Sequence, residues 1–285
     1  MKLLNLGCGS RYRRDWTNVD FQSYSSHVLS WNLKNGIPFD DGIFDLVYHS
    51  HVLEHFQKSE AKPFLSECCR VLKPNGVLRV VVPDLEEIVS SYLSVLSKLR
   101  NGEESLEPCY DWLMLEMFDQ TTRNSSGGEM LRHLLQESIP NIQYVLERGG
   151  KEMIDIVNSK KSYFHDSLKE MEHFNLVSLL RKIRFVVKNP KEIKRFLIKL
   201  ILGQEYEAWE IGKFRLSGEV HQWMYDEFSL GRLLSQSGFD QIKRVSPFDS
   251  SLSEWQNYNL DIECDEKGEI AVYKPNSLIM EGLKS

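Results

Sequence analysis

Short apolar strand patterns alternate with a helical pattern in the first third of the chain, and this alternation constrains the fold most. Residues 2–6, 17–20, 44–48 and 77–82 are predicted as strands, and residues 60–72 as an amphipathic helix. A Pro-Asn-Gly turn follows this helix and cannot continue it. Strands separated by helices indicate parallel βαβ units. The expected fold class is α/β, with a doubly wound and mostly parallel sheet.

The same alternation resumes near the C-terminus. Residues 225–237 are predicted as a helix and residues 239–245 as a strand. The last strand is predicted at residues 269–274, paired through a turn at residues 266–268. The predicted helix begins near Asp226 and is stopped by Gly238.

A long helical segment separates the two α/β regions, because helical periodicity continues there with almost no strand signal. We therefore predict one α/β domain formed by residues 1–87 and 216–285. Residues 88–215 are predicted as a helical insertion that binds a substrate or acts as a lid.

Composition and charge narrow the classes of function. The chain has 285 residues, 41% of them hydrophobic, and a formal net charge of -6, which argues against a general nucleic-acid binder. No apolar run approaches the roughly 20 residues that span a bilayer, and no signal-peptide pattern precedes the first strand. Five scattered cysteines predict a reduced, cytoplasmic protein without a metal site, and no pattern indicates an oligomeric state.

A glycine turn directly after the first strand predicts a ligand site. Gly7-Cys8-Gly9 follows the strand, and Asp20 ends the next strand. Glycine lets the backbone lie against a ligand, and such turns lie at the carboxyl ends of parallel strands. A carboxylate at the end of the second strand accepts ribose hydroxyls, although Asp20 can instead cap a turn. The third glycine of a dinucleotide site is replaced by Tyr12, and the connection at residues 11–16 allows only about one helical turn.

Several motifs in this order resemble class I S-adenosylmethionine-dependent methyltransferases. They include Asn-Leu-Gly-Cys-Gly at residues 5–9, Ile-Pro-Phe-Asp-Asp-Gly at residues 37–42, His-Val-Leu-Glu-His at residues 51–55 and Val-Pro-Asp at residues 82–84. The sequence is most similar to the branch found with bacterial surface-polysaccharide genes, over roughly the first 85 and last 70 residues. The resemblance implies a Rossmann-like methyltransferase fold and S-adenosylmethionine as cofactor.

The resemblance also implies which residues contact this cofactor. Gly7, Cys8 and Gly9 would lie under its methionine and ribose, and Asp20 would bind the ribose hydroxyls. The remaining expected contacts are Asn5, Asn32, Leu33, His49 and Ser50. Asn5 replaces the acid that often opens the first motif, and Asn32 and Leu33 occupy the place where adenine is read. His49 and Ser50, with His51 after them, would face the sulfonium.

Three side chains are candidate general bases for a hydroxyl acceptor: His55, Asp84 and His221. Asp84 ends a predicted strand, and His221 stands where the insertion rejoins the α/β domain. Two of them have a structural alternative: His55 can cap or pack within its helix, and His221 can hold the insertion against the α/β domain by a hydrogen bond. The predicted reaction is O-methylation of a sugar in a bacterial glycan or glycan precursor. The alternatives are a methyltransferase of an unrelated small molecule and a cofactor-binding protein without turnover.

Residues 51–55 also match the H-x-x-E-H pattern of zinc metalloproteases. That pattern places two histidines on one helical face and needs a third, carboxylate ligand on a later helix. The methyltransferase resemblance already accounts for the same segment, so the metalloprotease is the less favoured alternative.

A strongly basic stretch runs from Arg181 to Lys199 and is broken at Asn189-Pro190. Its two short amphipathic helices carry eight basic side chains against one acid, Glu192. Such helices bind anionic membranes or phosphorylated ligands, or they form a solvated basic face. Binding to an anionic membrane would place the protein at the inner face of the membrane as a peripheral protein. Binding to a phosphorylated ligand would make this stretch the phosphate contact of a lipid-linked or nucleotide-linked glycan acceptor.

Overall fold

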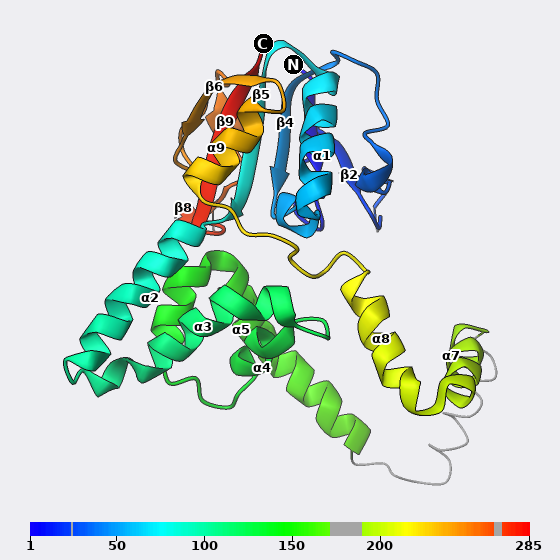
Figure 1. Cartoon of the computed structure of the whole chain (residues 1–285), viewed down its shortest axis with the longest axis vertical. Helices are drawn as coiled ribbons and strands as arrows, with labels where there is room; N and C mark the ends of the chain where they lie inside the picture. The colour runs from blue at the N-terminus through cyan, green and yellow to red at the C-terminus, as the bar shows by residue number, and fades with distance from the viewer. Residues whose placement is uncertain (24, 172–189, 265–269) are drawn as a thin grey trace.

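A computed structural model describes residues 1–23, 25–171, 190–264 and 270–285 (Figure 1). Its centre is a seven-stranded sheet with the order β3-β2-β1-β4-β5-β9-β6. The strands are β1 (Leu3–Leu6), β2 (Thr17–Asp20), β3 (Val28–Ser30), β4 (Phe44–Ser50), β5 (Leu72–Pro83), β6 (Phe239–Arg244) and β9 (Ser277–Lys284). β3, β2, β1, β4 and β5 pair in parallel, and β9 runs antiparallel to both β5 and β6. The prediction of a mostly parallel α/β sheet is confirmed.

Apolar side chains cover both faces of the sheet, as expected for parallel strands with helical connections. Helices α1 (Lys58–Val71) and α9 (Glu227–Ser235) lie on one face (Figure 1). Phe64 of α1 and Leu230 of α9 belong to the same buried cluster as Leu6 of β1. On the opposite face, Tyr48 packs with Trp16 and with Trp255 of the short helix α10 (Trp255–Tyr258). The connection at residues 11–16 contains a turn and no helix.

The described residues between β5 and the segment leading to α9 are mostly helical and lie beyond the carboxyl ends of the parallel strands (Figure 1). Its helices are α2 (Leu85–Arg100), α3 (Glu107–Thr122), α4 (Gly128–Leu134), α5 (Ile142–Met171), α7 (Pro190–Leu202) and α8 (Tyr206–Arg215). Trp112 and Leu134 are centres of a separate buried cluster. The Arg148 guanidinium of α5 pairs with Glu87 of α2 at 2.7 Å and with Glu116 of α3 at 2.6 Å. These ion pairs tie three helices of the insertion together.

The last strand of the sheet differs from the prediction. β8 (Ile270–Val272), within the predicted strand, pairs only with β7 (Ile262–Cys264) in a separate two-stranded sheet. The turn predicted at residues 266–268 lies outside the described residues. The main sheet is completed by β9, whose apolar run is interrupted by Glu281. Because Glu281 is fully buried against Arg79 of β5, at 2.7 Å, its charge is compensated inside the sheet.

Candidate functional site

The glycine turn after β1 is held against β2 by two backbone hydrogen bonds. The N–H groups of Gly7 and Cys8 donate to the Val19 carbonyl at 2.8 and 3.2 Å. Gly7 has φ +64°, and a Cβ added there would lie 2.3 Å from Cγ2 of Val52. Gly9 has φ +53°, but an added Cβ would meet no atom within 4 Å. Packing therefore requires glycine at position 7, whereas at position 9 the glycine leaves open space above the turn.

The Asp20 carboxylate faces this turn from the end of β2. Its Oδ2 accepts the Gly9 N–H at 2.8 Å, and its Oδ1 accepts the Gln22 N–H at 3.1 Å. An ionised carboxylate has about four lone-pair positions, so two remain for other donors. The structure thus brings together the turn and the acid that the sequence analysis paired.

Two cavities border the turn, and both are lined by Gly7 and His51. The inner cavity, of about 240 Å³, is lined among others by Asn5, Cys8, Gly9, Ser50, Leu260 and Tyr273. The outer cavity, of about 680 Å³, is lined among others by Asp20, Trp31, Asn32, Leu33, His55 and Glu219. All but one of the predicted cofactor contacts therefore border one of these two cavities.

Three of these predicted residues have defined structural contacts as well. The buried Asn5 amide donates to the Arg11 carbonyl at 3.2 Å, which fixes the chain after the turn. Asn32 caps a short 3-10 helix, η1 (Leu33–Asn35), by accepting the Lys34 N–H at 3.0 Å. Burial and the nearby Asp20 charge raise the pKa of the Cys8 thiol to about 12. Cys8 is therefore a neutral thiol at physiological pH and contributes shape rather than nucleophilicity.

His49 does not face either cavity. Its ring is fully buried and packs against Phe64 of α1, with ring centroids 5.2 Å apart. Burial lowers the pKa of His49 to about 4, so the ring is neutral. The expectation that His49 faces the sulfonium is wrong, because successive residues of a strand point to opposite faces and Ser50 takes the cavity side.

Asp84 is a structural residue rather than a general base. Its Oδ1 caps α2 by accepting the N–H groups of Glu86 and Glu87 at 3.1 and 3.3 Å. Its Oδ2 pairs with Arg244 of β6 at 2.7 Å, and the residue is 1% exposed. Both oxygens are thus engaged by the protein, and the prediction of Asp84 as a base is wrong.

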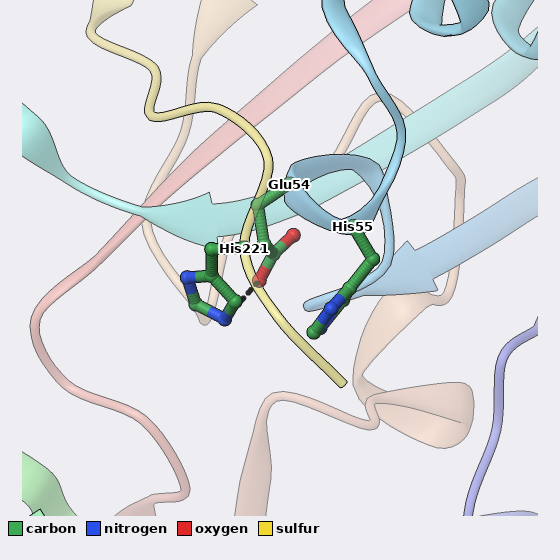
Figure 2. A group of neighbouring side chains, drawn as sticks. All are labelled: Glu54, His55 and His221. Carbon is green, nitrogen blue, oxygen red and sulfur yellow. Dashed lines mark ion pairs between the residues drawn. The ribbon is translucent and has the colours of Figure 1, made fainter. Parts of the chain in front are cut away.

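His55 and His221 do come together, around a third residue that the sequence analysis did not single out (Figure 2). Glu54 is fully buried, and its Oε1 lies 3.9 Å from Nε2 of His221. The His55 and His221 rings meet edge to face, with centroids 4.7 Å apart. His55 also borders the outer cavity. The two histidines therefore share one buried carboxylate.

The ionisation of this cluster follows from burial and from mutual attraction. Burial lowers the pKa of His221 to about 3 and also lowers the pKa of His55, against the attraction of the carboxylate. Burial alone would raise the pKa of Glu54, but His51 and then His221 and His55 outweigh it and lower that pKa. The carboxylate is therefore ionised, and His221 is a poor proton acceptor at neutral pH.

His51, which the resemblance placed beside Ser50 at the sulfonium, borders both cavities and contacts Glu54. Its Nδ1 lies 3.1 Å from Oε1 of Glu54, and its Nε2 lies 3.1 Å from Oγ of Ser277. Its φ of +54° is uncommon for a residue with a side chain. Strained backbone of this kind concentrates at functional sites, and His51 borders both cavities. Its signal in the sequence was its place three residues before Glu54.

The metalloprotease alternative fails on local structure. Only three residues of the pattern form a helical turn, the 3-10 helix η2 (Leu53–His55). His51 precedes it in the left-handed region, so His51 and His55 do not share a helical face.

The basic stretch is described only from residue 190 onward; residues 181–189 lie outside the described residues. Arg195 of α7 pairs with Glu210 of α8 at 2.5 Å, and its Nε donates to the Tyr206 hydroxyl at 2.9 Å. Part of this basic face therefore packs against α8. Among the described residues, no helix has the length and apolar character to cross a membrane.

Comparison with protein families identifies one matching segment. Residues 23–80 match the model of a family described as a methyltransferase domain. The match begins after Asp20 and includes Asn32, Glu54 and His55. No curated protein matches the chain.

Solved structures of methyltransferases resemble the fold at low identity. A chain from the complex between the Haloferax volcanii Trm112 methyltransferase activator and a candidate methyltransferase matches with 21% identity and a TM-score of 0.26, and the match covers 31% of this chain and 47% of that chain. An S-adenosylmethionine-dependent methyltransferase from Thermotoga maritima has 12% identity and a TM-score of 0.37, and the match covers 100% of this chain and 82% of that chain. PKMT2 from Rickettsia typhi, in complex with AdoHcy, has 12% identity and a TM-score of 0.34, covering 99% and 48%. The chain thus spans about half the length of the first and third structures.

The sheet order and the family match concern the same edge of the sheet. Strand order 3-2-1-4-5 with a glycine turn after the first strand is that of nucleotide-binding α/β sheets. The segment that matches the methyltransferase domain supplies Trp31, Asn32 and His51 to the cavities at this turn.

Proposed function

We propose that this protein transfers a methyl group from S-adenosylmethionine to a hydroxyl of a sugar in a bacterial glycan or glycan precursor. The methyl-transfer part is carried by one observation: the glycine turn faces the Asp20 carboxylate at the carboxyl edge of the parallel sheet. The sugar part is supported by the sequence resemblance to the polysaccharide-associated branch and by a polar cavity described below.

The two cavities at the turn fit the two halves of the cofactor. In the outer cavity, Asp20 would accept the ribose hydroxyls, and Trp31, Asn32 and Leu33 would surround the adenine. In the inner cavity, the methionine would lie over Gly9, where an added Cβ would meet nothing within 4 Å. Because Gly7 borders both cavities, the ligand would pass over the turn from one to the other.

A third cavity, of about 90 Å³, lies between the insertion and the sheet and also reaches His51. Besides His51, its polar lining includes Glu116, Gln120, Arg148, Glu152, Lys274, Asn276 and Ser277. Arg148 pairs with Glu116 and Lys274 with Glu152, so these side chains form a fixed polar wall. The Gln120 amide both donates and accepts hydrogen bonds, which suits the hydroxyls of a sugar acceptor.

S-adenosylmethionine, when bound, supplies a methyl group that is already electrophilic. The contribution of the chain is then to hold the acceptor oxygen in line, and alignment of this kind accounts for about 7–11 kcal/mol of a reaction barrier. His51 borders all three cavities, so it can contact an acceptor that approaches the turn. As the oxygen–methyl bond forms and the sulfur–methyl bond breaks, the hydroxyl proton would pass to the His51 ring or to water. Asp84 takes no part, because its oxygens cap α2 and bind Arg244.

Incubation with S-adenosylmethionine and a panel of nucleotide sugars and oligosaccharides tests this proposal. We expect at least one sugar to gain the mass of one methyl group, with stoichiometric release of S-adenosylhomocysteine. Amino-group and carboxylate acceptors serve as matched controls and should gain nothing. If S-adenosylhomocysteine binds but no sugar in the panel is methylated, the sugar part of the proposal is contradicted and the cofactor assignment stands.

A further inference from the structure

The Glu54 carboxylate is enclosed by imidazoles that come from distant parts of the chain. Glu54 and His55 belong to η2, whereas His221 lies in the segment between α8 and α9 (Figure 2). One ligand atom from each of the three residues lies within 4.8 Å of the other two. Glu54 is fully buried, His221 is 6% exposed, and His55 borders the outer cavity.

The polar atoms of this cluster are not satisfied by the protein. Neither oxygen of Glu54 nor Nδ1 of His55 has a hydrogen-bond partner among the described residues. His51 Nδ1, at 3.1 Å from Oε1 of Glu54, is the nearest group that can carry the opposite charge, and it faces only one of the two oxygens. A buried carboxylate that is only partly satisfied is costly, and buried polar atoms are nearly always paired. The cluster therefore points to a missing partner of opposite charge.

Backbone contacts hold the cluster in place independently of any ligand. The Gln222 and Trp223 N–H groups donate to the Glu54 carbonyl at 2.6 and 3.3 Å, and the His221 N–H donates to the Gln120 carbonyl at 2.9 Å. These bonds fix the segment that carries His221 against η2. The site is thus preorganised by the main chain, as binding sites on rigid supports are.

We propose that Glu54, His55 and His221 bind one divalent transition-metal ion, such as Zn²⁺, at the wall of the outer cavity. Two imidazole nitrogens and one carboxylate oxygen are a known Zn²⁺ ligand set that leaves a coordination position open. In tetrahedral geometry, zinc–ligand bonds of about 2.0–2.2 Å place two ligand atoms about 3.3–3.6 Å apart. The ligand atoms of the three side chains lie within 4.8 Å of one another, so they would approach by up to roughly 1.2–1.5 Å when the ion binds. Because His55 borders the outer cavity, the open position would face it.

This site differs from the H-x-x-E-H pattern, since His51 is not one of its ligands and Glu54 is. It also does not depend on the proposed methyl transfer. The competing explanation is a carboxylate neutralised by a proton shared with the neighbouring histidines, with no ion bound.

Zinc titration of the full-length protein, freed of metal with a chelator and dialysed, distinguishes the two explanations. By calorimetry we expect one Zn²⁺ per chain, and with Co²⁺ an absorption spectrum of nitrogen and oxygen ligands without thiolate bands. His55→Gln and His221→Gln keep a polar side chain of similar size and should each weaken Zn²⁺ binding by at least about tenfold. His27→Gln, at an exposed histidine, is the matched control and should bind like the unmodified protein.

Thermal unfolding of each variant shows whether it is folded, and Glu54→Gln adds a second test if either histidine variant is not. The proposal is overturned if the folded, unmodified protein binds no stoichiometric Zn²⁺, or if the folded variants bind it as tightly. Titration of the same metal-free sample with S-adenosylhomocysteine keeps the two proposals separate. Cofactor binding without Zn²⁺ binding would refute the metal site alone, and the reverse would refute the cofactor site alone.

Discussion

Gly9→Ala is expected to lower the affinity for S-adenosylhomocysteine by about 100-fold, equivalent to about 2.7 kcal/mol. In the free protein an added Cβ at position 9 meets nothing within 4 Å, so no protein atom is displaced. The methyl group would instead occupy the space above the turn, where the cofactor would lie against the backbone. Isothermal titration calorimetry of the variant and the unmodified chain measures the difference directly.

The matched control is Gly203→Ala. Gly203 has the same φ of +53° as Gly9, and its added Cβ also meets nothing within 4 Å. Both substitutions therefore carry the same backbone strain, about 1–2 kcal/mol, and differ only in what lies above the residue. Unchanged affinity is expected for Gly203→Ala. Equal affinities in the two variants would show that the turn does not contact the ligand.

Arg79→Ala is expected to reduce the free energy of unfolding by about 3–5 kcal/mol. Arg79 is fully buried in β5, where its Nε donates to Asp261 at 2.8 Å and its Nη1 to Glu281 at 2.7 Å. The guanidinium also lies 4.4 Å from the centroid of the Trp255 ring. Removing this one cation leaves two buried carboxylates without a counter-charge, which is the costly case for buried ion pairs.

Urea unfolding of Arg79→Ala and of Arg13→Ala gives this comparison. Arg13 also forms an ion pair, with Asp15 at 3.0 Å, but both side chains are largely exposed, so its loss should cost about 0–1 kcal/mol. If the two variants lose similar stability, the buried ion pairs do not hold β5, β9 and the C-terminal loops together.

The parts of the fold that sequence reasoning predicted depend on local patterns. The strands before Gly7 and Asp20 were predicted because apolar runs end at turn residues, and both ends meet in the structure. β9 was missed because Glu281 interrupts its apolar pattern. The Glu281 carboxylate can be buried because it accepts hydrogen bonds from Arg79, Ser250 and Ser251. These residues lie far from Glu281 in sequence, so no local pattern predicts a buried strand there.

The errors in the site have two different physical origins. Asp84 was misassigned although Asp84, Glu86 and Glu87 form a recognisable helix start, in which an N-cap acid precedes acids of the first turn. His49 and Ser50 are successive residues of β4, so their side chains point to opposite faces of the sheet, and only one of them can face the cofactor. The role of Glu54 could not be predicted, since it depends on His221, which reaches it only through the fold.

The central claim is that the turn and Asp20 bind the adenosine and methionine parts of S-adenosylmethionine. Calorimetric titration with S-adenosylhomocysteine tests it most directly, using the unmodified protein, Asp20→Ala and, as control, Asp40→Ala at an exposed aspartate. We predict one bound equivalent for the unmodified protein and for Asp40→Ala, and affinity at least about tenfold weaker for a folded Asp20→Ala, because hydrogen bonds to a charged group are lost. No binding by the unmodified protein, or equal binding by Asp20→Ala, would contradict the account.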